Sequence, residues 1–224
     1  MADTQLPLAT RCYVDGEARE RALRSLDSLL DNDIGDLEVT HEVSLRDDGF
    51  PVVALEGADA TAARNTLREQ WGEAVTPPSG EVGVGTLASW DDEGFVLATD
   101  SEVRVPRDEL GLGPGDADQI RTRYGLVQHV PLRFVGGDPP RLADVERDRL
   151  YEWTRGNGRV NVNSATRAEV RATVNRAGHA RDIVTVERLG LLEQSIVCKP
   201  GTDPPGLLAS IGEYLPSELL CVVP

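Results

Sequence analysis

The stretch LEVTHEVSLRDDGFPVVAL, residues 37–55, carries the pattern that decides the fold of the first third of the chain. Apolar side chains alternate with polar ones over residues 37–45, which predicts a strand with one face against a core. The Asp-Asp-Gly tripeptide at 47–49 is a hairpin turn signal, so residues 50–55 should return as a second strand. The sequence therefore predicts an antiparallel hairpin.

Elements on either side of this hairpin extend it into an α+β unit. Residues 9–14 alternate well enough for a strand, and leucines and alanines at helical spacing predict a helix over residues 17–30. After the hairpin, Asp59 is placed to cap a second helix that ends at Trp71. The predicted order is β-α-β-β-α.

The last third of the chain repeats that order after a leading helix over residues 142–153. Ser164 is expected to cap a helix that Gly178 ends, and Asp203 to cap a second helix that opens with Pro204. Strands are predicted at 159–162, 183–189, 193–199 and 218–223. We interpret the two units as ferredoxin-like and as products of an internal duplication. The alternative is that the β-α-β-β-α order is common and that its presence in both units is a coincidence.

The middle third differs from its neighbours because it holds short strands and glycine turns. Strands are expected at 81–90, 95–98, 102–105 and 127–135. This pattern is typical of a small β-barrel. Proline- and glycine-rich linkers separate the parts, giving an α+β chain with an N-terminal unit at 1–78, a barrel at 79–138 and a C-terminal unit with its leading helix at 139–224.

The composition is acidic and almost free of lysine. The 224 residues carry a net charge of -15, and all but one of the 23 basic residues are arginine, Lys199 being the exception. Such a surface is suited to concentrated salt, where repulsion between acidic groups is screened. An ordinary acidic cytosolic protein is the alternative. Three cysteines, no leader-like N-terminus and no run of about 18 apolar residues favour a cytoplasmic location without membrane contact.

Two segments resemble a known family. They are RVPRDELGLGPG at 104–115 and IRTRYGLVQHVPL at 120–132, and residues 159–215 are similar to it as well. The family is archaeal domain-of-unknown-function family 2110. The resemblance implies an archaeal, salt-adapted source and supplies no catalytic residue.

No motif in the sequence indicates an enzyme. Glycine loops for phosphates and nucleophile motifs are absent, and the spacing of His, Cys and acidic residues matches no metal site, so we expect no catalytic residue, cofactor or metal. His41 should be a core residue, and His179 should interact with the end of a helix. His129 is the best candidate for a pocket, although a structural role is expected first.

The distribution of charge along the chain says more about a binding partner than the motifs do. The first 79 residues hold 16 acids and seven bases, whereas residues 139–224 hold 11 of each. Within 155–181 only Glu169 opposes six arginines, which are Arg155, Arg159, Arg167, Arg171, Arg176 and Arg181. Arg167 and Arg171 should share one helix face, and guanidinium groups bind phosphate in a planar fork.

These six arginines are the predicted nucleic-acid or anion site, with RNA or a ribonucleoprotein as the expected partner. The alternative is that they pair with acids of the other units. A protein-interaction or small-ligand regulatory module and an enzyme are the other functions considered. The sequence leaves the oligomeric state open.

Overall fold

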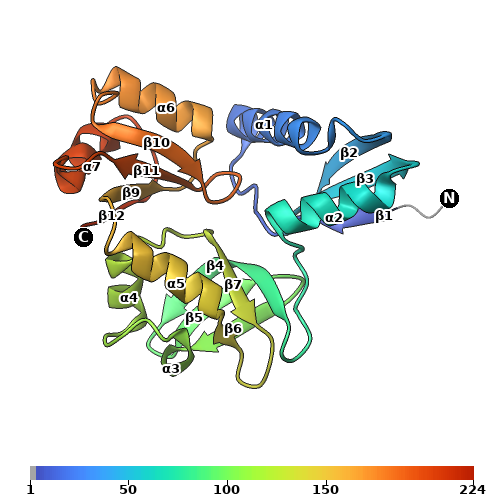
Figure 1. The fold of residues 1–224 in the computed structure, drawn as a ribbon, viewed down its shortest axis with the longest axis horizontal. Helices are drawn as coiled ribbons and strands as arrows, with labels where there is room; N and C mark the ends of the chain where they lie inside the picture. The colour runs from blue at the N-terminus through green and yellow to red at the C-terminus, as the bar shows by residue number, and fades with distance from the viewer. Residues whose placement is uncertain (1–3) are drawn as a thin grey trace.

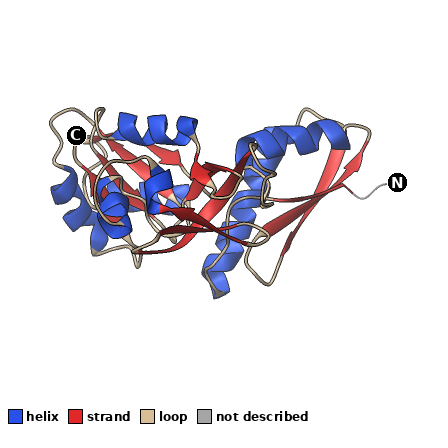
Figure 2. Ribbon diagram, turned by 90° about the horizontal axis from the view of Figure 1, so that it is seen from below, coloured by secondary structure: helices blue, strands red, loops and turns tan. Residues whose placement is uncertain are grey.

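The computed structural model describes residues 4–224 as three packed units, each built around one antiparallel sheet (Figure 1). The N-terminal and C-terminal units lie side by side, and the central unit lies against both of them (Figure 1). Seen from below, the N-terminal sheet and its helices form one end of an elongated molecule (Figure 2). The architecture is mixed α+β.

The N-terminal unit is a three-stranded sheet with two helices on one face. Its elements are β1 (Thr4–Pro7), α1 (Gly16–Ile34), β2 (Val39–Leu45), β3 (Pro51–Gly57) and α2 (Ala60–Trp71). The strand order is β1-β3-β2, so the hairpin strand β3 lies in the middle. Apolar side chains of both helices and of β3 form the buried core, among them Leu26, Leu30, Val53, Leu55 and Leu67. Their helical and alternating spacings explain why this segment folds as it does.

The predicted hairpin is confirmed, with Val39 opposite Gly57 and Leu45 opposite Pro51. The first strand was placed wrongly, because β1 precedes residues 9–14. That segment instead runs beside the turn between β2 and β3, where the Cys12 amide donates to the Gly49 carbonyl. Its apolar residues reflect burial rather than a place in the sheet, because Cys12 belongs to the core of the N-terminal unit and Ala9 packs near side chains of the central unit.

The central unit is a five-stranded sheet that curls into a half-barrel. Its elements are β4 (Val82–Asp91), β5 (Gly94–Ala98), β6 (Glu102–Pro106), α3 (Arg107–Leu110), α4 (Ala117–Arg123), β7 (Pro131–Val135), β8 (Arg141–Leu142) and α5 (Asp144–Trp153). The strand order is β6-β5-β4-β7-β8. A bulge between Leu87 and Ser89 marks where β4 bends.

The small β-barrel expected from the sequence is therefore a half-barrel. Side chains of α4 and α5, including Ile120, Leu150 and Trp153, share its buried core, and the last strand has only two residues. Helices thus cover the face that further strands would cover in a closed barrel. Residues of β8 and α5, which the sequence analysis assigned to the last unit, pack with this central sheet.

The C-terminal unit is a four-stranded sheet with two helices. Its elements are β9 (Arg159–Val162), α6 (Arg167–Arg176), β10 (Ile183–Arg188), β11 (Gln194–Cys198), α7 (Pro204–Gly212) and β12 (Leu219–Val222). The strand order is β10-β11-β9-β12, with every pair antiparallel. Asp203 caps α7 as predicted, because its carboxylate accepts from the Gly206 amide at 3.1 Å.

The cap of α6 differs from the prediction. Thr166 is the N-cap, and it forms a reciprocal capping box with Glu169. Ser164 instead adopts a left-handed backbone with φ of 60°. The helix therefore starts two residues later than expected, because the Thr-x-x-Glu pair satisfies two amide groups whereas Ser164 is needed at the contact between units.

The three units share buried clusters. Leu191 and Leu192, from the loop between β10 and β11, belong to the core of the N-terminal unit, and Val222 of β12 belongs to the core of the central unit. Cys12 and Cys198 are buried and Cys221 is partly exposed, all three being free thiols. Within residues 4–224, none of the helices combines the length and apolar character required to cross a membrane.

Candidate anion-binding groove and the junction of the three units

The six arginines predicted as one site lie in different surroundings. Arg159 forms an ion pair with Glu187 at 2.6 Å, and its side chain is only 15% exposed. Arg155 lies in the loop after α5, with its guanidinium 5.7 Å from the centre of the Tyr151 ring. Both residues therefore have partners within the chain.

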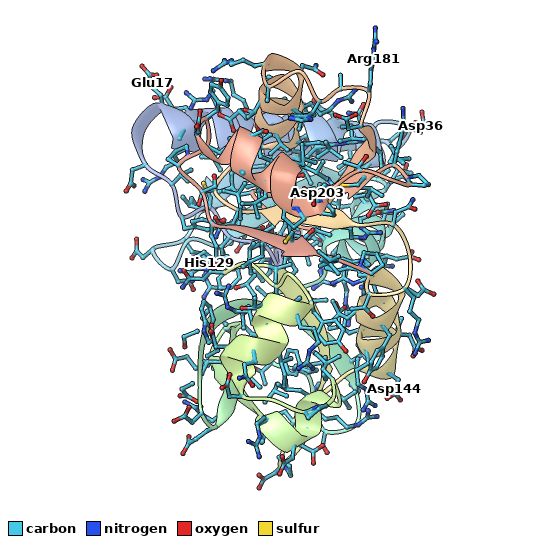
Figure 3. The ribbon with its side chains drawn as sticks, turned by 90° about the vertical axis from the view of Figure 1, so that its left-hand side faces the viewer. Glu17, Asp36, His129, Asp144, Arg181 and Asp203 are labelled. Carbon is cyan, nitrogen blue, oxygen red and sulfur yellow. The ribbon has the colours of Figure 1, made fainter. Side chains whose placement is uncertain are left out.

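Arg176 and Arg181 are exposed at the far end of α6 and beyond it. The guanidinium of Arg176 lies 5.9 Å from the ring centre of Tyr214. Arg181 extends away from the body of the molecule (Figure 3). These two residues provide positive charge at the surface without lining a hollow.

Arg167 and Arg171 do line a hollow, a groove of about 810 Å³ between α1 and α6. Their spacing of four places them on one face of α6, and Arg188 at the end of β10 joins them there. The remaining lining residues are small, polar or aliphatic: Ser25, Leu29, Ala168, Ala172, Asn175, Leu191 and Gln194. In the part of the chain that the structure describes, no acidic side chain lines this groove.

An ion pair across the two helices holds the groove together. Arg21 of α1 donates through Nε to Glu169 Oε1 of α6 at 2.9 Å. The other oxygen of Glu169 accepts from the Thr166 amide at 2.8 Å. Burial alone would raise the pKa of Glu169, but the hydrogen bonds from Thr166 and Arg21 hold it below its usual value. Glu169, the only acidic residue within 155–181, is therefore bonded to Arg21 and Thr166 and does not line the groove.

Arg188 lies outside the arginine-rich segment 155–181 and is not among the six predicted residues. Its guanidinium lies 4.0 Å from the ring centre of Trp71, the last residue of α2. Burial lowers the pKa of Arg188, and its Nη1 is buried without an acceptor among residues 4–224. No local pattern indicates this role, because the stacking partner comes from another unit.

A second hollow lies where all three units meet, and Arg188 lines this one too. It has a volume of about 480 Å³, and Arg68, Arg133 and Arg149 also line it. The two hollows therefore share one guanidinium group.

A buried hydrogen-bonded cluster joins the three units nearby. Tyr13, just before α1, donates its hydroxyl to Glu193 Oε1 at 2.6 Å and accepts from the Ser164 amide at 2.9 Å. The ring of His129, from the central unit, lies against the Tyr13 ring with centroids 4.0 Å apart. His129 lies at the level where the central unit meets the others (Figure 3). We call Tyr13, His129, Ser164 and Glu193 the junction.

The junction combines backbone strain with buried titratable groups. His129 and Ser164 both have a left-handed backbone, with φ of 69° and 60°. Burial raises the pKa of Glu193 to about 8 and that of Tyr13 well above its usual value, whereas it lowers the pKa of His129 to about 4. All three groups are therefore neutral near pH 7.

The neighbouring glycine makes room for this arrangement. A Cβ atom at Gly190 would collide with Glu193 Oε2 and with the Pro131 ring. His129 forms no ion pair with a carboxylate among residues 4–224, and its Nδ1 has no partner.

Comparisons with known protein families agree with the division into three units. The chain matches the DUF2110 N-terminal domain over residues 5–77, the DUF2110 central domain over 77–154 and the DUF2110 C-terminal domain over 157–223. The chain belongs to the DUF2110 family. The resemblance of the sequence is thereby confirmed. No curated protein matches the chain.

In this DUF2110 protein the groove lies between the N-terminal and C-terminal domains, and the junction draws on all three. The central domain of the family ends at residue 154, just after α5, in line with the packing of that helix.

The other two histidines have local partners. His41 Nε2 lies 2.9 Å from Asp27 Oδ1 of α1, with a side chain only 10% exposed, so it bridges a helix and a strand. His179, which follows the end of α6, has its Nδ1 2.7 Å from Asp182 Oδ2. Among residues 4–224 no three His, Cys, Asp or Glu side chains are grouped so as to hold a metal ion.

Replacing Tyr13 with phenylalanine tests the contribution of the junction to stability. The variant leaves the Ser164 amide and the buried Glu193 carboxyl without their hydroxyl partner. We expect the free energy of unfolding, measured in urea, to fall by about 1–3 kcal/mol. Tyr214→Phe is the matched control, because Tyr214 is 46% exposed, and it should change the value by less than about 0.5 kcal/mol. Equal effects of the two variants would contradict a role for the Tyr13 hydroxyl.

Proposed function

We propose that this DUF2110 protein binds RNA by holding its phosphate backbone in the groove between α1 and α6. One observation carries the proposal: Arg167, Arg171 and Arg188 line the groove, and within residues 4–224 no acidic residue does, although the chain has a net charge of -15. An unopposed cluster of guanidinium groups in so acidic a protein favours a polyanionic ligand. The partner is RNA, free or within a ribonucleoprotein.

The character of the groove favours contacts to phosphate over contacts to bases. None of the residues that line it is aromatic within the described chain, so a base has no ring on which to stack. Arginine binds phosphate through a planar fork, and this short-range geometry complements the long-range attraction that salt weakens. We therefore expect binding with little sequence preference.

The fold supports a further part of the proposal, that the two outer units are ferredoxin-like and arose by duplication. Both run β-α-β-β-α and place their third strand between the first two, as β1-β3-β2 and β9-β11-β10. The acidic, lysine-poor composition supports a salt-adapted archaeal source and a cytoplasmic location.

The test compares two double charge reversals of equal size. Arg167→Glu with Arg171→Glu changes the groove, whereas Arg176→Glu with Arg181→Glu changes exposed arginines outside it. We expect the first pair to weaken binding of a fluorescent single-stranded RNA by about tenfold or more, and the second by about twofold. Fluorescence anisotropy over a range of potassium chloride concentrations measures both.

Each outcome has a clear meaning. Equal losses for the two pairs would show that overall charge, rather than the groove, attracts RNA. Failure of the wild-type protein to bind RNA at any salt concentration would overturn the proposal. In that case capture of a protein partner from native cells would support the protein-interaction alternative.

A further inference from the structure

The second hollow, which lies where the three units meet and is called the cavity from here on, has walls of different chemistry. Trp71 and Gly72 from the end of α2 form one side, and Pro77 and Pro78 of the linker form another. Pro131 of β7 lies on the central side. With about 480 Å³, the cavity has the size of a small-molecule site, and its occupant would touch all three units.

The arginines of this cavity share their ion-pair partners. Arg68 shares Glu73, which also lines the cavity, with Arg64, which does not, at 3.4 and 2.5 Å. Arg133 and Arg149 share Glu146, a carboxylate with no exposed surface. Each carboxylate thus compensates two guanidinium groups.

Arg188 also lines the cavity and forms no ion pair with a carboxylate among residues 4–224, although Asp33 lies near enough to attract its charge. Its Nη1 and the Nε of Arg149 are both buried and lack acceptors. Glu69, Glu73 and Glu81 also line the cavity, but Glu69 and Glu81 are exposed to solvent, as are the side chains of Arg68 and Arg133, at 58% and 45%. The feature that points to an anion is therefore the pair of buried guanidinium nitrogens without acceptors, which is costly unless a ligand supplies them.

We propose that this cavity binds a phosphate monoester group, carried by a small molecule or by the end of an RNA strand. A phosphate group would supply acceptors for Arg188 Nη1 and Arg149 Nε, and the lining arginines approach the cavity from more than one unit. Trp71 is only 6% exposed and Arg188 covers its ring, so the site offers no aromatic face for a base. Val82, Val84 and the prolines are apolar surface for the organic part of the ligand.

Thermal unfolding of the full chain at constant ionic strength tests this site with named probes. Inorganic phosphate, glycerol phosphate and a mononucleotide should each raise the melting temperature relative to potassium chloride, by several degrees at saturating concentration. RNA oligonucleotides with and without a 5′-phosphate distinguish the two sources, because only a site for the strand end prefers the phosphorylated one. Absence of any shift with all these probes would overturn the proposal.

One variant separates the cavity from the groove. Val82→Glu adds a carboxylate at a cavity residue that is 56% exposed and does not line the groove, whereas Arg188→Met, at nearly constant volume, changes both hollows. Both should weaken phosphate binding by about tenfold or more, while Arg176→Met, outside the cavity, should leave it unchanged. Phosphate shifts that persist in both variants would overturn the assignment.

The same variants keep this inference independent of the proposed function. Arg167→Glu with Arg171→Glu changes the groove and no residue that lines the cavity, so it should weaken RNA binding by about tenfold or more and preserve the phosphate shift. Val82→Glu should weaken the phosphate shift and preserve the binding of RNA that lacks a terminal phosphate. Loss of both activities in both proteins would show that the two hollows do not act as separate sites and would contradict the inference.

Discussion

Replacing Glu193 with glutamine is expected to remove a loss of stability that the wild-type protein shows as the pH rises from about 6.5 to about 8. Glu193 is fully buried, and burial raises its pKa from 4.5 to about 8. The folded protein therefore keeps a proton on Glu193 that the unfolded chain releases. Its contribution to stability is complete below pH 4.5 and is lost as the pH rises through about 8.

His129 has the opposite effect at lower pH. Burial lowers its pKa from 6.5 to about 4, so the unfolded chain binds the proton first and stability is lost as the pH falls through that range. Between pH 4.5 and 6.5 the two residues oppose each other. Above pH 6.5 only Glu193 acts, and the wild-type protein should lose about 2 kcal/mol by pH 8.

Urea unfolding at a series of pH values measures this effect. The difference between wild type and Glu193→Gln should grow in favour of the variant above pH 6.5. Glu213→Gln is the matched control, because Glu213 is exposed and should follow the wild-type curve. Parallel curves for wild type and Glu193→Gln would show that Glu193 is already ionised in the folded protein.

The second large effect is expected at Glu146, the carboxylate between α5 and the half-barrel. Its oxygens pair with Arg149 and, at 3.5 Å, with Arg133, and its side chain has no exposed surface. Glu146→Ala leaves both guanidinium groups without this carboxylate, although the Arg133 and Arg149 side chains, 45% and 27% exposed, keep part of their hydration. We expect the free energy of unfolding to fall by about 2–3 kcal/mol.

Asp148→Ala is the control for Glu146, because it removes an exposed carboxylate from the same helix. It should cost less than about 0.5 kcal/mol. Saturating phosphate should restore part of the stability of Glu146→Ala, since the anion replaces the lost charge. A loss below about 1 kcal/mol for Glu146→Ala would mean that the two arginines find other partners.

Much of the secondary structure could be predicted because its signals are local. The turn at Asp47-Asp48-Gly49, the alternation of β2 and the Asp203 cap each involve residues close in the chain. The helix α4 was overlooked although Asp116 and Gln119 form a capping box that the sequence displays. The cap of α6 was misplaced because Ser164 and Thr166 are equally plausible by residue type.

The candidate site was predicted only in part. Arg167 and Arg171 were identified together because a helix places residues four apart on one face. Arg159, in contrast, is paired with Glu187, which the sequence analysis could not foresee since pairing across strands depends on their order in the sheet. Arg188 was not considered, although it lines both hollows.

The sequence by itself determined the hairpins, the longer helices, the acidic first two thirds and the family. Only the tertiary structure decided which arginines act together, and it placed Tyr13, His129 and Glu193 in one junction. The physical reason is that periodicity and capping act over a few residues, whereas the groove and the junction depend on how whole units pack. Arg188 and Trp71, for example, lie far apart in the sequence and form a stacked pair only because the packing of two units brings them together.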